Sequence, residues 1–146
     1  LSMKISTRGR YALRLMIDLA IHQDEGNISL KDISKRQDIS IKYLEQIVKP
    51  LTKHKLIKST RGSHGGYSLT KKPSEYTAKD ILTVLEGPIA CVTCLEDPVN
   101  KCPRFKSCPT ISFYEGLNKL INDYLETYTL EDLIKSNDLA SDVDYK

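Results

Sequence analysis

Long hydrophobic runs, a secretory leader and common enzyme motifs are all missing from the sequence. No stretch approaches the about 18 consecutive apolar residues of a membrane span, so none is expected. Arg14 and Asp18 interrupt the most apolar early segment, residues 12–21, and no small-residue cleavage site follows it, which argues against a signal peptide. No phosphate-binding glycine loop, nucleophile–histidine arrangement or paired acid site stands out, so we do not expect an enzyme. These absences favour a cytoplasmic protein with reduced thiols.

Charge is distributed unevenly along the 146 residues, whose formal net charge is +3. Residues 1–72 hold 15 Lys and Arg against 6 Asp and Glu, whereas residues 73–146 hold 7 against 13. The basic half, residues 1–72, is therefore expected to bind a polyanion such as nucleic acid, and the acidic half, residues 73–146, is expected to have a different role. The plainer alternative is that the lysines only keep the chain in solution. The length suits one domain, or a small domain with an appendage.

The basic half has the periodicity of a helix-turn-helix followed by a β-hairpin. Apolar spacing predicts a first helix over residues 6–22, a short second helix capped by Ser29 and a third capped by Ser40. Short strands are expected at residues 56–61 and 67–70, around a glycine-rich tip in which Gly65 and Gly66 supply positive φ. This order predicts a mainly α fold with a small β-hairpin wing, a winged helix-turn-helix DNA-binding domain over residues 3–88. Met3 is taken as the natural start, after a two-residue cloning remnant.

The acidic half is expected to hold a long helix for dimerisation. Thr77 caps a fourth helix, which Gly87 and Pro88 end, and a cysteine-rich loop over residues 89–110 follows. The next helix spans residues 111–128, and a short helix and a frayed polar tail share residues 129–146. Tyr114, Leu117, Ile121, Tyr124 and Tyr128 recur about every 3.5 residues, and Leu120 and Leu125 widen the stripe. Because the first domain already has a core, we expect a homodimer with Leu117, Ile121, Tyr124 and Tyr128 in its interface. Burial of this stripe against its own chain is the alternative.

Four cysteines lie within eighteen positions, at Cys91, Cys94, Cys102 and Cys108. In the cytosol such a cluster more often holds metal than disulfides. Four thiolates, two of them in the spacing Cys91-x-x-Cys94, could bind zinc tetrahedrally. Alternatively the thiols hold no metal and are plain loop residues or redox thiols.

Several motifs in one order resemble the IscR/NsrR/CymR family of bacterial winged-helix transcription regulators, the Rrf-two family. The resemblance rests on residues 3–14 at the start, 39–46 in the third helix, 61–69 in the wing, 81–88 at the end of the fourth helix, the cysteine loop, and 129–133. It implies a homodimer that binds a DNA operator with two-fold symmetry. Two residues depart from easy helix geometry: Pro50 lies inside the third helix, and Lys55 stands where a helix-ending glycine would fit best.

The resemblance also implies which residues contact DNA. Gln46 can bond adenine, Glu45 can accept from cytosine, and Lys42 can reach guanine or phosphate. Tyr43 and Lys49 lie on the same helix away from its apolar stripe. Glu45 could instead only pair with Lys42 or Lys49. Arg61 matches the family's wing arginine, expected in the minor groove, with His64 at the wing tip. Arg8 and Arg10 would contact phosphates.

Many members of this family hold an iron–sulfur cluster, typically [2Fe-2S], through three loop cysteines, here Cys94, Cys102 and Cys108. The fourth ligand of two known types is absent, because Ile111 and Arg10 stand at the matching positions. Cys91 is therefore a candidate fourth ligand. The resemblance thus predicts a regulator that senses cluster supply, iron, nitric oxide or redox state. Other family members have no cluster and are controlled by a partner protein, and zinc is a further alternative. A winged helix used mainly to dock another protein is the runner-up.

Overall fold

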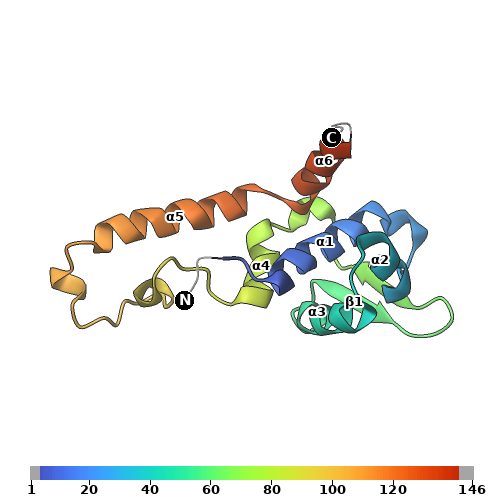
Figure 1. Ribbon diagram of the computed structural model, residues 1–146, viewed down its shortest axis with the longest axis horizontal. Coiled ribbons are helices and arrows are strands. Elements are labelled where there is room, and N and C mark those ends of the chain that lie inside the picture. Colours follow the sequence, from blue (N-terminus) through green and yellow to red (C-terminus); the bar gives the residue numbers. More distant parts are fainter. Residues whose placement is uncertain (1–3, 142–146) are drawn as a thin grey trace.

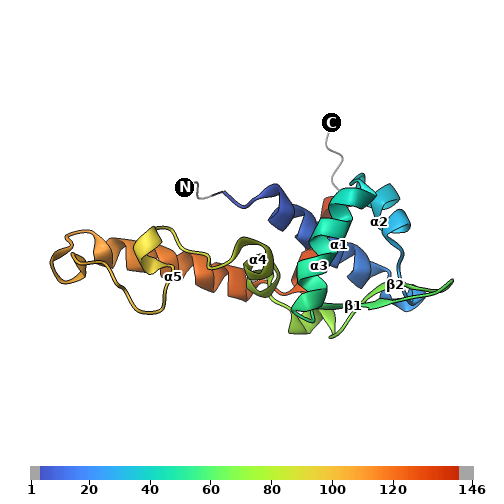
Figure 2. The same ribbon diagram turned by 90° about the horizontal axis from the view of Figure 1, so that it is seen from below.

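The computed structural model describes residues 4–141, and their side chains as far as Ser136. A compact part carries the first four helices and the wing, and an arm formed by α5 (Ile111–Thr127) and the cysteine loop projects from it (Figure 1). The wing tip and the cysteine loop lie at opposite ends of this elongated molecule (Figure 2). No helix in residues 4–141 is long and apolar enough to cross a membrane. Our expectation of a frayed tail concerns, at residues 142–146, positions outside the described part.

Each of the first three helices begins at a serine whose hydroxyl accepts a backbone N–H. α1 (Thr7–Ile21) starts after Ser6, α2 (Leu30–Gln37) after Ser29 and α3 (Ile41–Lys53) after Ser40, each with an Oγ···N distance of 3.1 Å. Such caps satisfy backbone donors that the first turn leaves unpaired. The predicted helix-turn-helix is therefore confirmed, with the turn after α2 made at Asp38, whose φ is 54°.

The end of α3 shows how Pro50 and Lys55 are accommodated. The helix continues through Pro50 for three further residues. Leu56 N then donates to Leu51 O and Lys55 N to Thr52 O, both at 3.0 Å, the paired bonds of a Schellman motif. Lys55 has φ of 60°, so a lysine occupies the left-handed position that glycine adopts most easily.

The wing is an antiparallel hairpin of β1 (Ile57–Thr60), one residue shorter at each end than predicted, and β2 (Gly66–Leu69), which begins and ends one residue earlier than predicted. Gly66 has φ of 146°, as expected, but the expectation of positive φ is wrong for Gly65. Gly65 is needed for a different reason, because a Cβ there would lie 2.2 Å from the Thr60 carbonyl oxygen. The backbone of Ile28 bonds to Tyr67 on the other edge of β2 at 2.8 and 2.9 Å and so ties the wing to the segment before α2.

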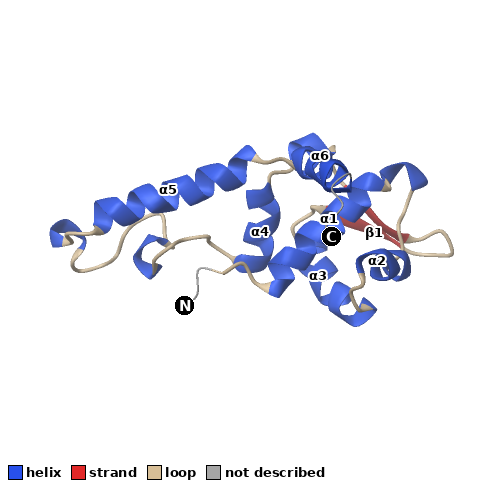
Figure 3. Cartoon of the chain, turned by 45° about the horizontal axis from the view of Figure 1, so that its top comes forward, coloured by secondary structure: helices blue, strands red, loops and turns tan. Residues whose placement is uncertain are grey.

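The core lies between α1, α3, α4 (Ala78–Glu86) and the base of the wing, and the last helix belongs to it. α6 (Leu130–Ser141) returns to pack against α1, and Leu130 is fully buried (Figure 3). Its start is tied to the start of α4, since Leu130 N donates to Tyr76 O at 2.9 Å and Ala78 N to Tyr128 O at 2.8 Å. α6 runs to Ser141 and is longer than the short helix expected within residues 129–146, because it packs on α1.

A buried ion pair joins the first two helices. Asp18 of α1 is 1% exposed, and its two carboxylate oxygens accept from Arg36 Nε at 3.0 Å and Nη2 at 2.8 Å. Gln37 Nε2 also donates to Asp18, at 3.0 Å. Bidentate pairing with an additional hydrogen bond compensates for moving the carboxylate out of water. This network therefore sets how α2 packs on α1.

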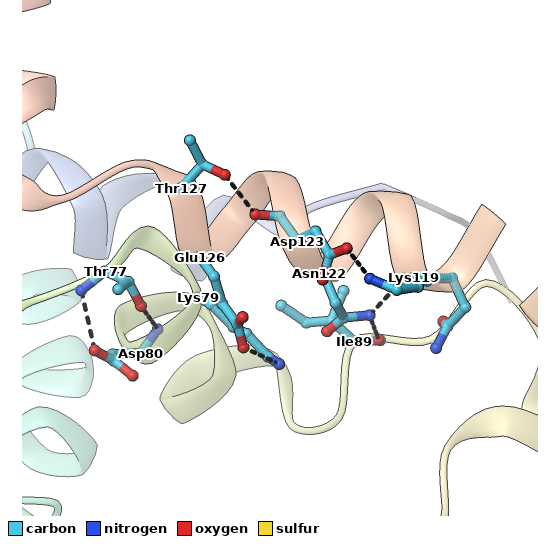
Figure 4. A network of polar contacts seen from close by, with 10 residues as sticks. Thr77, Lys79, Asp80, Ile89, Lys119, Asn122, Asp123, Glu126 and Thr127 are labelled. Atoms are coloured by element: carbon cyan, nitrogen blue, oxygen red, sulfur yellow. Dashed lines mark hydrogen bonds and ion pairs between the residues drawn. The ribbon is translucent and has the colours of Figure 1, made fainter. Parts of the chain in front are cut away.

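Apolar side chains and an ion pair attach the end of α5 to the compact part, where Leu13 of α1 and Leu82 of α4 line a shared pocket with Leu125. Lys79 Nζ of α4 pairs with Glu126 at 2.8 Å, and within the arm Asn122 Nδ2 donates to Ile89 O, at the start of the cysteine loop, at 3.0 Å (Figure 4). No residue of α5 is buried, although the helix runs for 17 residues. A helix with this many apolar residues and no buried position has an unfilled packing face.

Candidate DNA-binding surface and cysteine loop

The exposed face of α3 gathers four of the predicted DNA-contacting residues. Lys42, Glu45, Gln46 and Lys49 are all exposed, whereas Leu44, Ile47, Val48 and Leu51 on the opposite side are buried. No ion pair joins Glu45 to Lys42 or Lys49 in the described structure, so the carboxylate is free to meet an external donor. The arrangement presents hydrogen-bond donors and acceptors on one side of an α-helix, an element that the DNA major groove can admit.

Tyr43, also predicted to contact DNA, is half-buried and supports the helix. Its ring packs edge-on against Tyr11 of α1, with centroids 5.3 Å apart and an interplanar angle of 74°. The Arg14 guanidinium lies 5.2 Å from the centre of the Tyr11 ring, and Arg14 also donates to the Gln37 carbonyl at the end of α2. These contacts hold the start of α3 against α1 and α2. Sequence reasoning missed Arg14, since nothing local distinguishes it from other exposed helical arginines.

The wing stands beside the second half of α3. Lys49, Thr52 and Lys53 line a groove with Ser59 and Tyr67 of the two strands. At the tip Arg61 and His64 are exposed, and Asn27 Nδ2 donates to the His64 carbonyl at 3.1 Å. The tip is thus anchored through its backbone while its two side chains remain available.

Arg8 and Arg10 are exposed on the first turns of α1, next to Tyr11 and hence near the start of α3. This end of α1 is fixed by Glu86 at the end of α4. Ser6 N donates to Glu86 Oε1 at 3.0 Å and the Ser6 hydroxyl donates to the same oxygen. Gly9 is needed for this contact, because a Cβ there would lie 2.3 Å from Glu86 Oε1. Glu86 therefore links the α1 start to the residues that lead into the cysteine loop.

The predicted interface residues occupy an apolar arc of α5. Tyr124 is 63% exposed, whereas Leu117, Ile121 and Tyr128 are half-buried on the side nearer their own chain. The most exposed apolar side chains of α5 are Phe113 at 67% and Leu120 at 70%. Phe113 and Leu120 are seven residues apart, which is about two helical turns, so both lie on one face of α5 and widen its apolar stripe. Leu120, Ile121, Tyr124 and Leu125 also line an apolar groove on this helix.

The cysteine loop, residues 89–110, contains two single 3₁₀ turns, η3 (Thr93–Leu95) and η4 (Phe105–Ser107). Its four cysteines are half-buried, and none of them forms a disulfide. Cys91 is held against α5, since its N–H donates to Asn118 Oδ1 at 3.1 Å and its thiol to Tyr114 O at 3.4 Å. Within the described residues no three His, Cys, Asp or Glu side chains lie close enough together to hold a metal ion. The structure therefore does not bring Cys94, Cys102 and Cys108 into one site.

The chemistry of the donor set nevertheless suits thiolate ligation. A hydrogen bond with the Thr110 hydroxyl lowers the pKa of the Cys108 thiol, and the backbone at Thr110 and Ile111 and the charge of Arg104 act in the same direction. A lower pKa increases the fraction of thiolate, the form that binds metal. Three or four cysteine side chains on one loop fit an iron–sulfur cluster or zinc by ligand type, provided that the loop closes around it.

A helix-turn-helix with a wing and a polar, partly basic recognition face defines a winged-helix transcription regulator. The profile of the Rrf2 family, described as "Iron-dependent Transcriptional regulator", matches residues 5–136. The chain therefore belongs to the Rrf2 family of DNA-binding transcription regulators, and the resemblance found in its motifs is confirmed.

Similarity to individual family members extends along most of both chains. The protein rrf2 of Nitratidesulfovibrio vulgaris is 40% identical over 138 residues, covering 94% of this chain and 91% of that relative. The structure of CymR, described as the global cysteine regulator of B. subtilis, is 41% identical with a TM-score of 0.74, covering 91% and 97% of the two chains. IscR of T. potens is 38% identical with a TM-score of 0.74, covering 94% and 90%. These relatives are regulators, in agreement with the absence of enzyme motifs.

Proposed function

We propose that the protein is a cytoplasmic homodimer that binds a two-fold symmetric DNA operator through α3 and the wing. The observation that carries this proposal is the exposed row of Lys42, Glu45, Gln46 and Lys49 on a helix whose other side is buried. Gln46 bonds an adenine edge, Glu45 accepts from a cytosine amino group, and Lys42 reaches guanine or phosphate. Lys49 contributes positive charge on the side nearer the wing.

The remaining predicted contacts flank this row. Arg61 enters the minor groove, where narrow A·T tracts concentrate negative potential, and His64 lies beside it at the wing tip. Arg8 and Arg10 contact phosphates and so orient the protein without reading sequence. Tyr43 serves chiefly to hold α3 in place, because its ring packs on Tyr11.

A second copy of the chain covers the apolar arc of α5 in this proposal. Leu117, Ile121, Tyr124 and Tyr128 form the interface, extended by Phe113 and Leu120. An isologous contact of this helix gives a two-fold axis, so the two recognition faces meet a palindromic operator. The support is physical: an unburied 17-residue helix with an apolar arc is costly in water unless something packs on it.

The cysteine loop is proposed as the sensor. Cys94, Cys102 and Cys108 hold a [2Fe-2S] cluster, with Cys91 as candidate fourth ligand, and a bound cluster supplies a centre sensitive to iron supply, nitric oxide or redox state. The family description as iron-dependent and the lowered pKa of the Cys108 thiol support this assignment.

The start of the loop is tied to parts that matter for DNA binding, and its other end continues directly into α5. Glu86, just before it, bonds to Ser6 at the start of α1, and Cys91 bonds to Asn118 and Tyr114 of α5. Drawing the three thiols together would change the path of the loop between these fixed ends. The position of α5 relative to α1, and hence the spacing of two recognition helices in a dimer, would then respond to loop closure.

A metal-free regulator controlled by a partner protein is the second candidate. It is favoured by the dispersed cysteines and by the similarity to CymR, a cysteine regulator in B. subtilis. In this case the thiols bind zinc or remain free, and α5 or the loop meets the partner.

Anaerobic purification followed by a visible spectrum with iron, sulfide and zinc analysis separates these candidates. Near-equal iron and sulfide with visible absorption is expected, lost in Cys94→Ala. Cys91→Ala serves as the matched variant: cluster loss there too assigns the fourth ligand, and retention excludes it. A colourless protein after reconstitution would contradict the cluster, and its zinc content would distinguish zinc from no metal.

Binding to duplexes selected from a random pool tests the DNA assignments. Arg61→Ala should weaken A·T-flanked sites most, and Lys42→Ala should lower affinity and reduce the salt slope by about 1 for each protomer. Lys135→Ala removes an exposed lysine of α6, outside the proposed DNA-binding surface and the cysteine loop; it is the control and should leave both quantities unchanged. Unchanged binding by the first two variants would refute the groove assignments.

A further inference from the structure

Ile41 is a large apolar side chain left exposed on the polar face that the proposed function assigns to DNA. It is the first residue of α3 and is 42% exposed, whereas Leu44, Ile47, Val48 and Leu51 of the same helix are buried. Its neighbours Ser40 and Lys42 are exposed and polar. Ile41 is thus an apolar group at the beginning of a surface otherwise made of hydrogen-bonding and charged groups.

The fold does not require isoleucine at this position. The start of α3 is stabilised by the Ser40 hydroxyl, which accepts from Tyr43 N at 3.1 Å. The residues that flank a helix start as a hydrophobic staple are here Ile39 and Leu44, and both belong to the buried core. Since the cap and the staple are supplied by other residues, neither explains the exposed side chain of Ile41.

The placement of Ile41 suits contact with bases rather than with the DNA backbone. The second half of α3 lines the groove shared with the wing, through Lys49, Thr52 and Lys53. The first half carries Ile41 and, one turn further, Glu45 on the same side of the helix. In helix-turn-helix proteins the N-terminal residues of the recognition helix contact base edges. Ile41 therefore lies in the part of α3 that enters the major groove.

We infer that Ile41 packs against the C5-methyl group of a thymine and helps to select the operator sequence, an inference that rests on the proposed function. The thymine methyl is the apolar feature of the major-groove edge, and polar side chains such as Gln46 and Glu45 do not gain from it. Contact between the two apolar groups removes both from water. Ile41 thereby reads a base that its hydrogen-bonding neighbours leave unread.

Replacing thymine by deoxyuridine isolates this contact, because it removes only the methyl group and keeps base pairing. Operators are first enriched from a randomised duplex pool with the full chain, and each thymine is then replaced in turn. The parent protein should lose about fourfold in affinity at one thymine of each half-site, as expected for one methyl group returned to water. Ile41→Ala should bind the thymine duplex more weakly and show no further loss with deoxyuridine.

Two further variants control for folding and for general surface effects. Ile41→Val keeps the β-branch and should retain part of the methyl effect. Ile21→Ala removes an isoleucine of similar exposure, 45%, at the end of α1, and should keep the full fourfold response. An enriched operator without a methyl-sensitive thymine, or an undiminished methyl effect in Ile41→Ala, would overturn this inference while leaving sequence-specific binding intact. A pool from which no sequence is enriched would overturn the proposed function and this inference together.

Discussion

The Tyr76 hydroxyl joins the segment before β1 to the segment after β2, and its removal should lower the stability measurably. Tyr76 is fully buried, and its hydroxyl donates to Leu56 O at 2.7 Å. It accepts from Thr70 N at 2.9 Å and from Lys71 N at 3.0 Å. Leu56 precedes β1 and Thr70 follows β2, so one oxygen closes the base of the wing. Tyr76→Phe removes all of these bonds and keeps the ring.

The expected loss follows from the number of bonds and from what can replace them. Three hydrogen bonds at about 1 kcal/mol each give about 2–3 kcal/mol in the free energy of unfolding. The larger penalty for buried unpaired groups is reduced here, because Thr70 and Lys71 are exposed and Thr70 Oγ1 also donates to Leu56 O at 3.2 Å. At this chain length the loss corresponds to a fall in Tm of about 6–9 °C.

Thermal and urea unfolding followed by circular dichroism measure this difference directly. Tyr67→Phe is the matched control, since the Tyr67 hydroxyl has no hydrogen bond within the described residues and the side chain also lies at the wing. Its Tm should change by about 1 °C or less, as for a substitution that breaks no contact. Equal Tm losses in the two variants would refute the assignment of the Tyr76 hydroxyl as the tie at the wing base.

Three other substitutions test separate features of the fold. Lys55→Gly should raise the free energy of unfolding by about 0.5–1 kcal/mol, because Lys55 has a left-handed φ of 60°; a lower stability in urea unfolding would contradict this. Arg36→Ala should lower it by about 3–5 kcal/mol, because it leaves the buried Asp18 carboxylate without its cation, and a double-mutant cycle with Asp18→Ala should show strong coupling rather than additive losses. Hydrogen bonds from the Thr129 backbone and then its hydroxyl lower the pKa of Asp132 at the start of α6. The Asp132 carboxylate therefore stabilises the fold above the pKa that it has in the unfolded chain, and this stabilisation is lost as pH falls through its pKa in the folded protein. Asp132→Asn should consequently unfold at a lower Tm than the parent at pH 7, and at an equal Tm in strong acid.

Local features of the fold could be predicted because their causes lie within a few residues. The serine caps at Ser6, Ser29 and Ser40 and the capping box of Thr77 follow from a hydroxyl three positions before a free N–H. The hairpin was also predicted from neighbouring residues, because the short segments 56–61 and 67–70 flank a glycine-rich tip. Gly65 was misjudged, since close approach to the Thr60 carbonyl, not its own φ, requires glycine there.

Periodicity also indicated the candidate DNA-binding face, with one refinement. The stripe of Leu44, Ile47 and Leu51 places Lys42, Glu45 and Gln46 on the other side of α3, and the structure has them there. Tyr43 was assigned to the same surface, but its ring is half-buried against Tyr11, 32 positions away in the chain. Helical spacing cannot reveal a neighbour supplied by another element.

The sequence by itself determined the order of elements, the caps, the polar face of α3 and the presence of an apolar arc on α5, because each depends on spacing along the chain. Only the tertiary structure decided the Asp18–Arg36 pair, the link from Glu86 to Ser6, the entry of Leu130 into the core and the dispersed positions of the four thiols. These depend on contacts between segments as much as 80 positions apart. Such contacts form only where burial of the surrounding side chains compensates for the entropy of closing the chain between them.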